Sequence, residues 1–367
     1  MTKQLARVGW ALVMLLAFTL LQTSAANAAS RIIPIECGKD IDAVINTDPV
    51  GTGTLFRLTG DCHDERQNPQ PFTASATIQP KDGDGIICSI PATLNPLPLS
   101  NSPGFFAYDP ETHCTINGAS GVTQVIKPQG LFYMNGIMVT GGTFTGAAAT
   151  GVGIAEGQMD NNSVVRGSVV RDTQGAGISN AHGFHHQIEL TNTTTNPNAL
   201  GFIGSGIKGI NEFNIQYSYV HDNQGNGIWC DVYCTDQTSA QFSSFHAKFN
   251  LVVNNGRAGI RWERIGDFGG ASQANSGEAI IENNELYGNG KDTTRGAIDI
   301  RDAQDALVQN NYFRSNWGGI AIRASDSGRS DRPDLDNIDI VNNILNREQL
   351  KGCELPDNIV FCLGNIP

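Results

Sequence analysis

The stretch Ser218-Tyr-Val-His-Asp-Asn-Gln-Gly-Asn-Gly-Ile228 decides the fold, because the same phrase returns several times along the chain. In each copy a Ser or Asn precedes a short apolar run, a polar turn follows, and Gly-Ile or a near variant opens another apolar run. Further copies occupy 168–178, 250–260 and 311–320. Repeats at intervals of roughly 20 to 40 residues indicate stacked units that share an apolar core.

The isoleucine that closes each phrase marks one position of the repeat. The apolar runs around it are short and rich in Val, Ile and Tyr, and no helical period runs through them. Because the spacing is irregular, the extra residues must lie in loops on one side of the stack. Three short strands per turn, punctuated by Asn and Gly, resemble the coils of a right-handed parallel β-helix, an all-β solenoid. The anchoring isoleucines are Ile154, Ile178, Ile207, Ile228, Ile260, Ile298 and Ile320.

A second column of the repeat is polar. Counting back from each Gly-Ile pair aligns one Ser or Asn per copy. Asn tolerates left-handed backbone and can bond its neighbours along a stack, which a tight turn between two sheets requires. We therefore predict a turn ladder made of Ser168, Ser218, Asn250, Asn284, Asn311 and Asn343.

Residues 1–28 are typical of a secretory signal peptide. Lys3 and Arg7 precede an apolar run, and Ala26-Asn27-Ala28 forms a small-residue cleavage site. The formal charge of -12 argues against binding to nucleic acid or to anionic membranes. No later apolar run is long enough for membrane insertion. We expect a secreted, soluble monomer, located in a periplasm or outside the cell.

The eight cysteines all follow the signal peptide, and an even number in an exported chain indicates disulfides. We predict that each cysteine pairs with its neighbour in the sequence, because such bridges would tie single coils or caps locally. The predicted pairs are Cys37 with Cys62, Cys88 with Cys114, Cys230 with Cys234, and Cys353 with Cys362.

One domain with a cap at each end is expected. A solenoid needs caps, because its terminal coils would otherwise expose apolar core and open strand edges. The predicted segments are 29–130, an N-terminal cap with the first irregular coils, 131–345, the β-helix, and 346–367, the C-terminal cap. A short capping helix is expected after Cys37, a first strand at 53–58, and an irregular excursion at the Pro-rich stretch 91–110.

Side chains alternate between the two faces of a strand, so the residues after each anchoring isoleucine can be assigned to faces. If the isoleucine points inward, the first and third residues after it point outward. Because parallel strands stack about 4.8 Å apart, the outward residues predict one exposed, charged patch. The first outward column contains Ser179, Lys208, Trp229, Arg261, Asp299 and Ala321, the second contains Ala181, Ile210, Asp231, Glu263, Arg301 and Arg323, and Cys230, Trp262 and Ile300 point inward between them.

Mixed charges beside an exposed Trp favour a cleft for an acidic polysaccharide, with the indole as a stacking surface. In a lyase, a base removes the proton next to a uronate carboxylate while a cation neutralises that carboxylate. The predicted base is Lys208 or Arg261. Arg301 or a Ca²⁺ ion is the predicted neutraliser, because calcium binds several oxygen ligands. The predicted calcium ligands are Asp231, Glu263 and Asp299, and the predicted substrate contacts are Trp229, Arg301, Asp299 and Arg323.

Two other interpretations stay open. In a glycoside hydrolase, Asp231 and Glu263 would serve as acid and as nucleophile or base, although the basic residues around them favour two ionised carboxylates. In a non-catalytic glycan-binding or surface-structural solenoid, the charged columns would form cross-strand ion pairs. Each carboxylate would then have its own basic partner. The histidines at 182, 185 and 186 are expected to be solvated loop residues at the rim of the patch.

Three motifs resemble the pectate-lyase-like superfamily of right-handed parallel β-helices, and in particular its exported bacterial repeat proteins. They are Gly53-Thr-Leu-Phe-Arg-Leu58, Gly201-Phe-Ile-Gly-Ser-Gly-Ile-Lys208 and Asp222-Asn-Gln-Gly-Asn-Gly-Ile-Trp-Cys-Asp231. The resemblance covers most of 35–345. It implies a catalytic face on the outer side of one parallel sheet, often with calcium and a Lys or Arg base. The Asp-Pro-His-Asp motif of alginate epimerases is absent, as is the Asn-Thr-Asp motif with a following Asp-Asp pair of polygalacturonases, so neither activity is expected.

Overall fold

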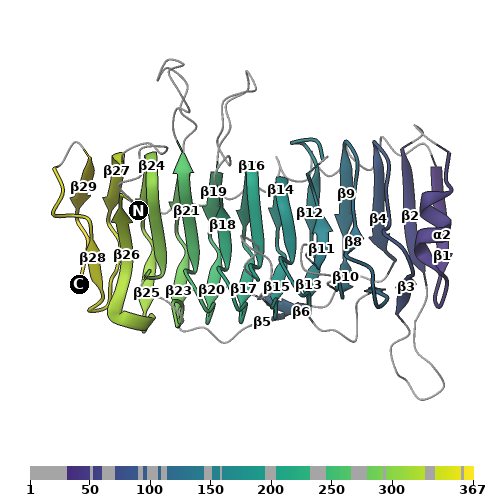
Figure 1. Ribbon diagram of the computed structural model, residues 1–367, viewed down its shortest axis with the longest axis horizontal. Helices are drawn as coiled ribbons and strands as arrows, with labels where there is room; N and C mark the ends of the chain where they lie inside the picture. The colour runs from purple at the N-terminus through teal and green to yellow at the C-terminus, as the bar shows by residue number, and fades with distance from the viewer. Residues whose placement is uncertain are drawn as a thin grey trace, which may run out of the picture.

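Strands that pair in parallel with strands of the next coil make up almost all of the structure. The computed structural model describes residues 31–49, 53–59, 71–89, 94–96, 106–108, 114–143, 151–157, 159–194, 204–231, 245–265, 279–291, 295–326, 335–356 and 359–367. Figure 1 shows the coils following one another along the long axis, from α2 (Ile41–Asn46) at one end to β29 (Val360–Leu363) at the other. The chain is a right-handed parallel β-helix, as the repeat predicted.

Two parallel sheets form the walls of the β-helix. In the described part of the chain, the larger sheet, sheet A, has 18 strands and holds the first and second strand positions of each coil, while sheet B has 9 strands and holds the third. Sheet A contains β1 (Arg31–Glu36), β2 (Thr54–Thr59), β4 (Asp84–Cys88), β8 (Gln124–Ile126), β9 (Phe132–Asn135), β11 (Val152–Ala155), β12 (Val164–Arg166), β14 (Ile178–His186), β16 (Ile207–Gln216), β18 (Ile228–Cys230), β19 (Phe245–Lys248), β21 (Ile260–Ile265), β22 (Ala279–Glu282), β24 (Ile298–Gln309), β26 (Ile320–Ser325), β27 (Asp336–Val341), β28 (Gln349–Lys351) and β29. Sheet B contains β3 (Phe72–Ala74), β7 (Cys114–Gly118), β10 (Ile137–Thr140), β13 (Val169–Arg171), β15 (Glu189–Thr191), β17 (Tyr219–His221), β20 (Leu251–Val253), β23 (Glu285–Tyr287) and β25 (Tyr312–Arg314).

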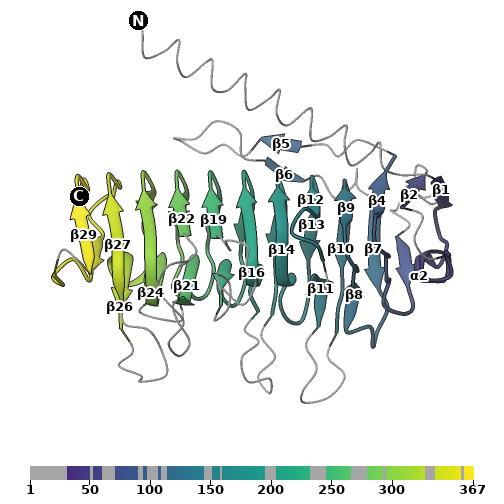
Figure 2. The same cartoon turned by 90° about the horizontal axis from the view of Figure 1, so that it is seen from above.

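The first two strand positions belong to one sheet because some strands run through both. Strand β24 pairs with β21 along its first half and with β22 along its second half. Strand β14 does the same with β11 and β12. The view in Figure 2 separates these coils along the axis. In the Pro-rich stretch, β5 (Leu94–Pro96) and β6 (Phe106–Tyr108) form an antiparallel pair outside both parallel sheets.

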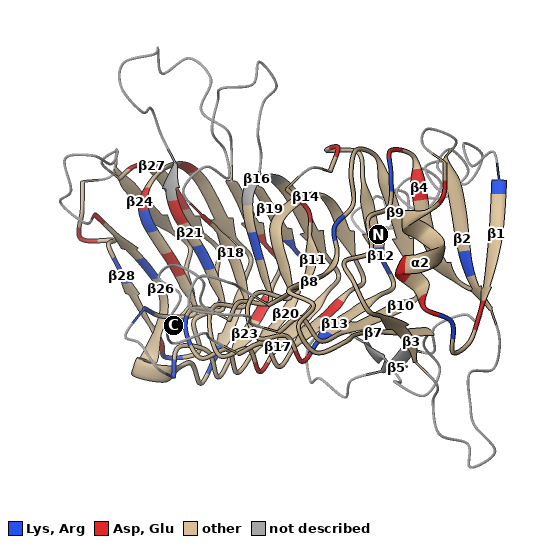
Figure 3. Cartoon of the chain, turned by 45° about the vertical axis from the view of Figure 1, so that its right-hand side comes forward, with Lys and Arg blue, Asp and Glu red and all other residues tan. Residues whose placement is uncertain are grey.

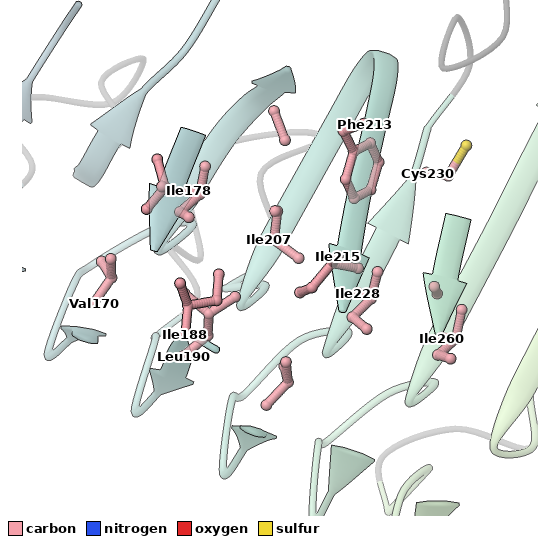
Figure 4. Close-up of a cluster of buried hydrophobic side chains, with 14 of the residues drawn as sticks. Val170, Ile178, Ile188, Leu190, Ile207, Phe213, Ile215, Ile228, Cys230 and Ile260 are labelled. Atoms are coloured by element: carbon pink, nitrogen blue, oxygen red, sulfur yellow. The ribbon is translucent and has the colours of Figure 1, made fainter. Parts of the chain in front are cut away.

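The apolar core lies between sheets A and B, and the anchoring isoleucines form one of its columns. Ile154, Ile178, Ile207, Ile228, Ile260 and Ile298 occupy the same register position in successive strands, and all are fully buried. Figure 4 shows the middle of this column facing apolar residues of sheet B such as Val170 and Leu190. The alternation that places these side chains inward also places their neighbours on the outer face.

The register prediction is wrong at one end. Ile298 pairs with Ile322 rather than with Ile320, so Asp299 pairs with Arg323. The 3-10 turn η3 (Trp317–Gly319) precedes this strand and contains Gly318 and Gly319, both with positive φ. Strand β26 therefore joins the sheet two residues later than the sequence phrase indicates.

The predicted turn ladder is present between the second and third strand positions. Asn284 shows its pattern: Nδ2 donates to the Ala247 carbonyl at 2.8 Å and to Asn311 Oδ1 at 3.0 Å. Its own Oδ1 accepts from the backbone N and the Nδ2 of Asn250. Ser218 joins at one end and Asn365 at the other. The predicted member Ser168 lies in the same column, but Ile188 separates it from Ser218, so the ladder does not reach it. Each amide thus binds its own coil to the next one.

A second ladder, which the sequence analysis missed, lies at the turn after the third strand position. The backbone N and Nδ2 of Asn255 both donate to Asn289 Oδ1, and Asn289 repeats this with Asn316. The ladder starts at Thr193 and ends at Glu348, whose carboxylate accepts from Asn316. Burial raises the pKa of Glu348.

Disulfides fasten the ends of the described structure. Cys88 is bonded to Cys114 and Cys353 to Cys362, as predicted. Cys37 and Cys230 are also disulfide-bonded. Their predicted partners, at 62 and 234, lie outside the described residues.

The two ends of the β-helix differ. Helix α2 caps the N-terminal end, as predicted, but β1 precedes it and pairs in parallel with β2. At the other end, β28 and β29 pair in parallel with β26 and β27, so coils continue into 346–367. Among the described residues, no helix is long and apolar enough to cross a membrane. The predicted signal peptide lies outside them.

Candidate functional site

The first outward column exists on sheet A as predicted, apart from its last member. Ser179, Lys208, Trp229, Arg261 and Asp299 pair one after another across β14, β16, β18, β21 and β24. Arg323 then takes the place predicted for Ala321, and Lys351 follows it. Figure 3 shows basic and acidic positions side by side on β21, β24 and β26. The columns therefore bring cations and carboxylates of several coils together.

The second column is less regular. Glu263 pairs with Arg301 as predicted. In β14, however, Asn180 has a φ of 51° and forms a bulge, so Ala181 pairs with Gly209 and is buried. The alternation of faces restarts there, because a bulge adds one residue to a strand.

The prediction of an exposed patch is wrong for most of these residues. Lys208 is 8% exposed, Trp229 5% and Asp299 2%, and Arg261 and Glu263 are also buried. Asp231, Arg301 and Arg323 are half-buried and form the more accessible part of the group. Charges that are this well buried require partners, because desolvation is otherwise very unfavourable.

Lys208 has two such partners. Its Nζ lies 2.8 Å from Asp231 Oδ2 and 4.3 Å from the centre of the Trp229 ring. Arg261 approaches the same ring, with Cζ at 5.4 Å from its centre. The face of an indole attracts cations, so Trp229 holds two positive groups beside one another.

Arg261 also links the carboxylates of the next strands. Its Nη2 lies 2.7 Å from Glu263 Oε2, while its Nε lies 3.9 Å from Asp299 Oδ2. Arg295, just before β24, places Nη1 3.7 Å from the same Asp299 oxygen. The two longer contacts exceed hydrogen-bond distance. Arg295 lies in the turn before Ile298, the anchoring isoleucine of its coil. Counting forward from Ile298 therefore could not find it.

Three buried nitrogen donors in this group have no acceptor. Within the described part of the chain, Trp229 Nε1, Arg261 Nε and Arg295 Nη1 are inaccessible to solvent and make no hydrogen bond. Buried donors without acceptors are rare in proteins, and each costs about 1–3 kcal/mol. Two of them, on Arg261 and Arg295, lie 3.9 and 3.7 Å from Asp299 Oδ2, and the third belongs to the indole beside Arg261. An additional oxygen atom beside these donors would be stabilised.

Asp299 is the titratable centre of the group. Burial raises its pKa to about 6, although Arg261 and Arg323 act in the opposite direction. A carboxyl group with such a pKa can exchange a proton near neutral pH, which proton transfer requires. From its place in the outward column Asp299 was expected to contact substrate or calcium, because alternation alone does not show that a side chain is buried.

The arrangement does not fit a calcium ion. Asp231 is paired with Lys208, Glu263 with Arg261, and Asp299 faces two guanidinium groups. Calcium prefers several carboxylate or carbonyl oxygens that are free to face it. Among the residues described, no group of three or more His, Cys, Asp or Glu side chains could hold a metal ion.

The three clustered histidines are not solvated loop residues. His185 is 1% exposed and lies in the core, where Nδ1 is 3.2 Å from the Asn214 carbonyl and Nε2 is 3.0 Å from Glu156 Oε2. Since a carbonyl only accepts, Nδ1 is the donor of the first bond. Glu156 also accepts from the His182 backbone N. This buried pair lies at the bend between the first two strand positions, and the sequence offers no sign of it.

Comparison with known proteins supplies similar structures but no relative. No family model matches the sequence, and a search of curated proteins found no significant match. A crystal structure of an alginate lyase from Paenibacillus sp. is 13% identical, with a TM-score of 0.45 over 92% of this chain and 100% of that one. The A-module of an Azotobacter vinelandii mannuronan C-5 epimerase is 13% identical, with a TM-score of 0.46 over 89% and 93%. Pectate lyase Pel9A is 11% identical, with a TM-score of 0.43 over 87% and 81%. By its strand pairing the chain is a right-handed parallel β-helix, and similarities at this level assign it neither a family nor an activity.

Proposed function

We propose that this chain is an exported carbohydrate-active protein that cleaves a uronate-containing polysaccharide by β-elimination. The observation that carries the proposal is the set of three buried donors without acceptors, on Trp229, Arg261 and Arg295. A carboxylate is the sugar substituent that best complements two guanidinium groups, because it accepts charge-assisted hydrogen bonds from both. An acidic sugar would therefore relieve an unfavourable feature of the free protein.

The residues around the donors can take the separate roles that an elimination requires. Arg261 and Arg295 would hold the substrate carboxylate and stabilise the negative charge that develops on it. Lys208 Nζ, in its uncharged form, would take the proton from the carbon next to the carboxylate. The electron pair of that C–H bond becomes the new carbon–carbon double bond, and the bond to the leaving sugar oxygen breaks. Asp299, when protonated, can supply the proton that this oxygen needs.

Asp231 positions the base. Its carboxylate lies 2.8 Å from Lys208 Nζ, and Trp229 restrains the same group from the other side.

A second candidate is a non-catalytic glycan-binding or surface-structural solenoid, and the ion pairs favour it. Each carboxylate of the group faces its own cation, which was the arrangement expected if the columns only stabilise the sheet. A hydrolase built on Asp231 and Glu263 is less well supported, since both acids are paired with cations and the raised pKa belongs to Asp299.

The test is the absorbance of unsaturated uronide while the protein is incubated with polygalacturonate, alginate and glycosaminoglycans, with calcium and with chelator. We expect product formation that Lys208→Ala lowers by roughly 10²–10⁴-fold, the usual contribution of a general base. Arg171→Ala is the matched control, because Arg171 forms a 2.7 Å ion pair with Asp172 on the outer face of sheet B. A loss of activity in the presence of chelator would contradict the conclusion that the site does not fit calcium. If no substrate gives either unsaturated products or new reducing ends, both enzymatic interpretations are excluded.

A further inference from the structure

Two aromatic side chains stack on the outside of the β-helix, away from the charged columns. Tyr217 follows β16 and Phe249 follows β19, at the tight turn between the second and third strand positions. Their ring centres are 5.0 Å apart and the rings are within 4° of parallel. Tyr217 is 47% exposed and Phe249 37%. Rings of this size normally contribute to the core, so their place in solvent needs an explanation.

The backbone at these two positions favours other residue types. Tyr217 has a φ of 52° and Phe249 of 55°, in the left-handed region where bulky side chains are rare. Apart from Gln187, neighbouring coils use residues that adopt this conformation more readily, namely Gly167, Asn283, Asn310 and Asn342. Bulky residues persist in such conformations where function requires the side chain, as unfavourable backbone geometry often does at binding sites.

A row of polar side chains runs beside the stack. The outward residues that immediately precede the turn pair in register across the coils. Lys248 Nζ lies 3.1 Å from Glu282 Oε1, and Gln309 Nε2 donates to Glu282 Oε2 at 2.7 Å. Burial lowers the pKa of the nearby His246 to about 4, so its ring is uncharged at neutral pH. The row offers hydrogen-bonding groups without an uncompensated charge.

The stack ends at Phe249, because the next coil carries Asn283 at the same position. A ring placed there would lie about one coil spacing, 4.8 Å, beyond Phe249 and directly beside Lys248 and Glu282. We propose that this place binds a pyranose ring of a neutral glycan, with its C–H face on Phe249 and its hydroxyl groups bonded to Lys248, Glu282 and Gln309. The C–H groups of a sugar carry partial positive charge, which the face of an aromatic ring attracts.

The surroundings favour a neutral sugar over the other candidates. A uronate would need a free cation, but Lys248 is already matched by Glu282. A second copy of this chain is a poorer occupant, since two rings offer far less than the roughly 800 Å² per partner of stable interfaces. This site lies at the second strand position of sheet A and does not depend on the proposed elimination.

The decisive variant is Phe249→Asn, which introduces the residue type that the next coil uses. If the ring is kept for binding, this variant should melt at the same or a higher temperature, because Asn suits the left-handed backbone better. Its affinity for the glycan should fall at least tenfold. Phe249→Tyr, which retains the ring, should keep both binding and stability.

Affinity gel electrophoresis measures the binding, with hydroxyethyl cellulose, glucomannan, galactomannan and xyloglucan as neutral probes and polygalacturonate as the acidic one. Trp317→Asn is the control, since Trp317 is 52% exposed but lies at η3, outside the stack. Retardation of the wild-type protein by a neutral probe, lost in Phe249→Asn and kept in Trp317→Asn, is the expected result. No retardation by any neutral probe would overturn the proposal. So would a lower melting temperature of Phe249→Asn, which would make the stack a structural element.

Discussion

Removing one rung of the first asparagine ladder should destabilise the protein by an amount that the hydrogen bonds allow us to calculate. Asn284 is 1% exposed. Its amide donates two hydrogen bonds, to Ala247 O and Asn311 Oδ1, and accepts two from Asn250, at distances of 2.8 to 3.0 Å. Asn284→Ala removes all four, and the Asn250 N–H loses its ladder acceptor inside the protein. At about 1 kcal/mol for each bond, we expect a loss of about 4 kcal/mol in the free energy of unfolding.

Urea titration followed by circular dichroism measures this loss, and the end of the same ladder provides the control. Asn365 accepts two bonds from Asn343 and donates one to the Ile340 carbonyl, but it is partly exposed, so water can replace the lost partners. Asn365→Ala should therefore cost only about 1–2 kcal/mol. A loss below 1 kcal/mol in Asn284→Ala, or equal losses in the two variants, would refute the view that burial of the ladder gives it its strength.

Two further predictions concern the charged site and the disulfides. The pKa of Asp299 is raised to about 6 from 3.8. Its contribution to the free energy of unfolding is therefore complete below about pH 4 and is lost as the pH rises through 6. The loss amounts to about 3 kcal/mol. Wild-type protein should lose that much stability between pH 4 and pH 8 relative to Asp299→Asn, and parallel pH curves in urea titrations would contradict the assignment. Replacing Cys88 and Cys114 by Ser should destabilise more than replacing Cys353 and Cys362, because the sequence separations are 26 and 9. Loop entropy gives about 3.5 and about 2.6 kcal/mol, and the reverse order in thermal melts would count against the entropic explanation.

The repeated phrase was sufficient to predict the β-helix, its isoleucine column and its first asparagine ladder. These features depend on local periodicity, which a single sequence displays directly. The second ladder was missed although Asn223, Asn255, Asn289 and Asn316 are equally regular, because each lies inside the turn that was treated as a spacer. The predicted register of Ile320 was wrong because two glycines in η3 displace the strand that follows. The spacing of residues in a sequence does not show the conformation of the turn between two strands.

The candidate site was predictable in its composition but not in its environment. Alternation placed Lys208, Trp229, Arg261 and Asp299 in one column, and the structure pairs them in that order. It could not show that these side chains are buried, nor that each carboxylate has a cation beside it. Arg295 was missed because it comes from the preceding turn. Burial and ion pairing depend on contacts between coils, which the position of a residue within its own repeat does not determine.

The two ladders have a consequence for how new binding surfaces could arise on this chain. In the coils that they span, the ladders fix the spacing between coils at two of the three corners. A change in chain length there is tolerated most easily at the bend between the first and second strand positions. That bend adjoins Asp231 after β18 and Glu263 near the end of β21. Segments exchanged there would change what surrounds the charged residues without altering the stack below. The β-helix can therefore serve as a fixed support on which specificity is rebuilt one coil at a time, by natural selection or by grafting in the laboratory.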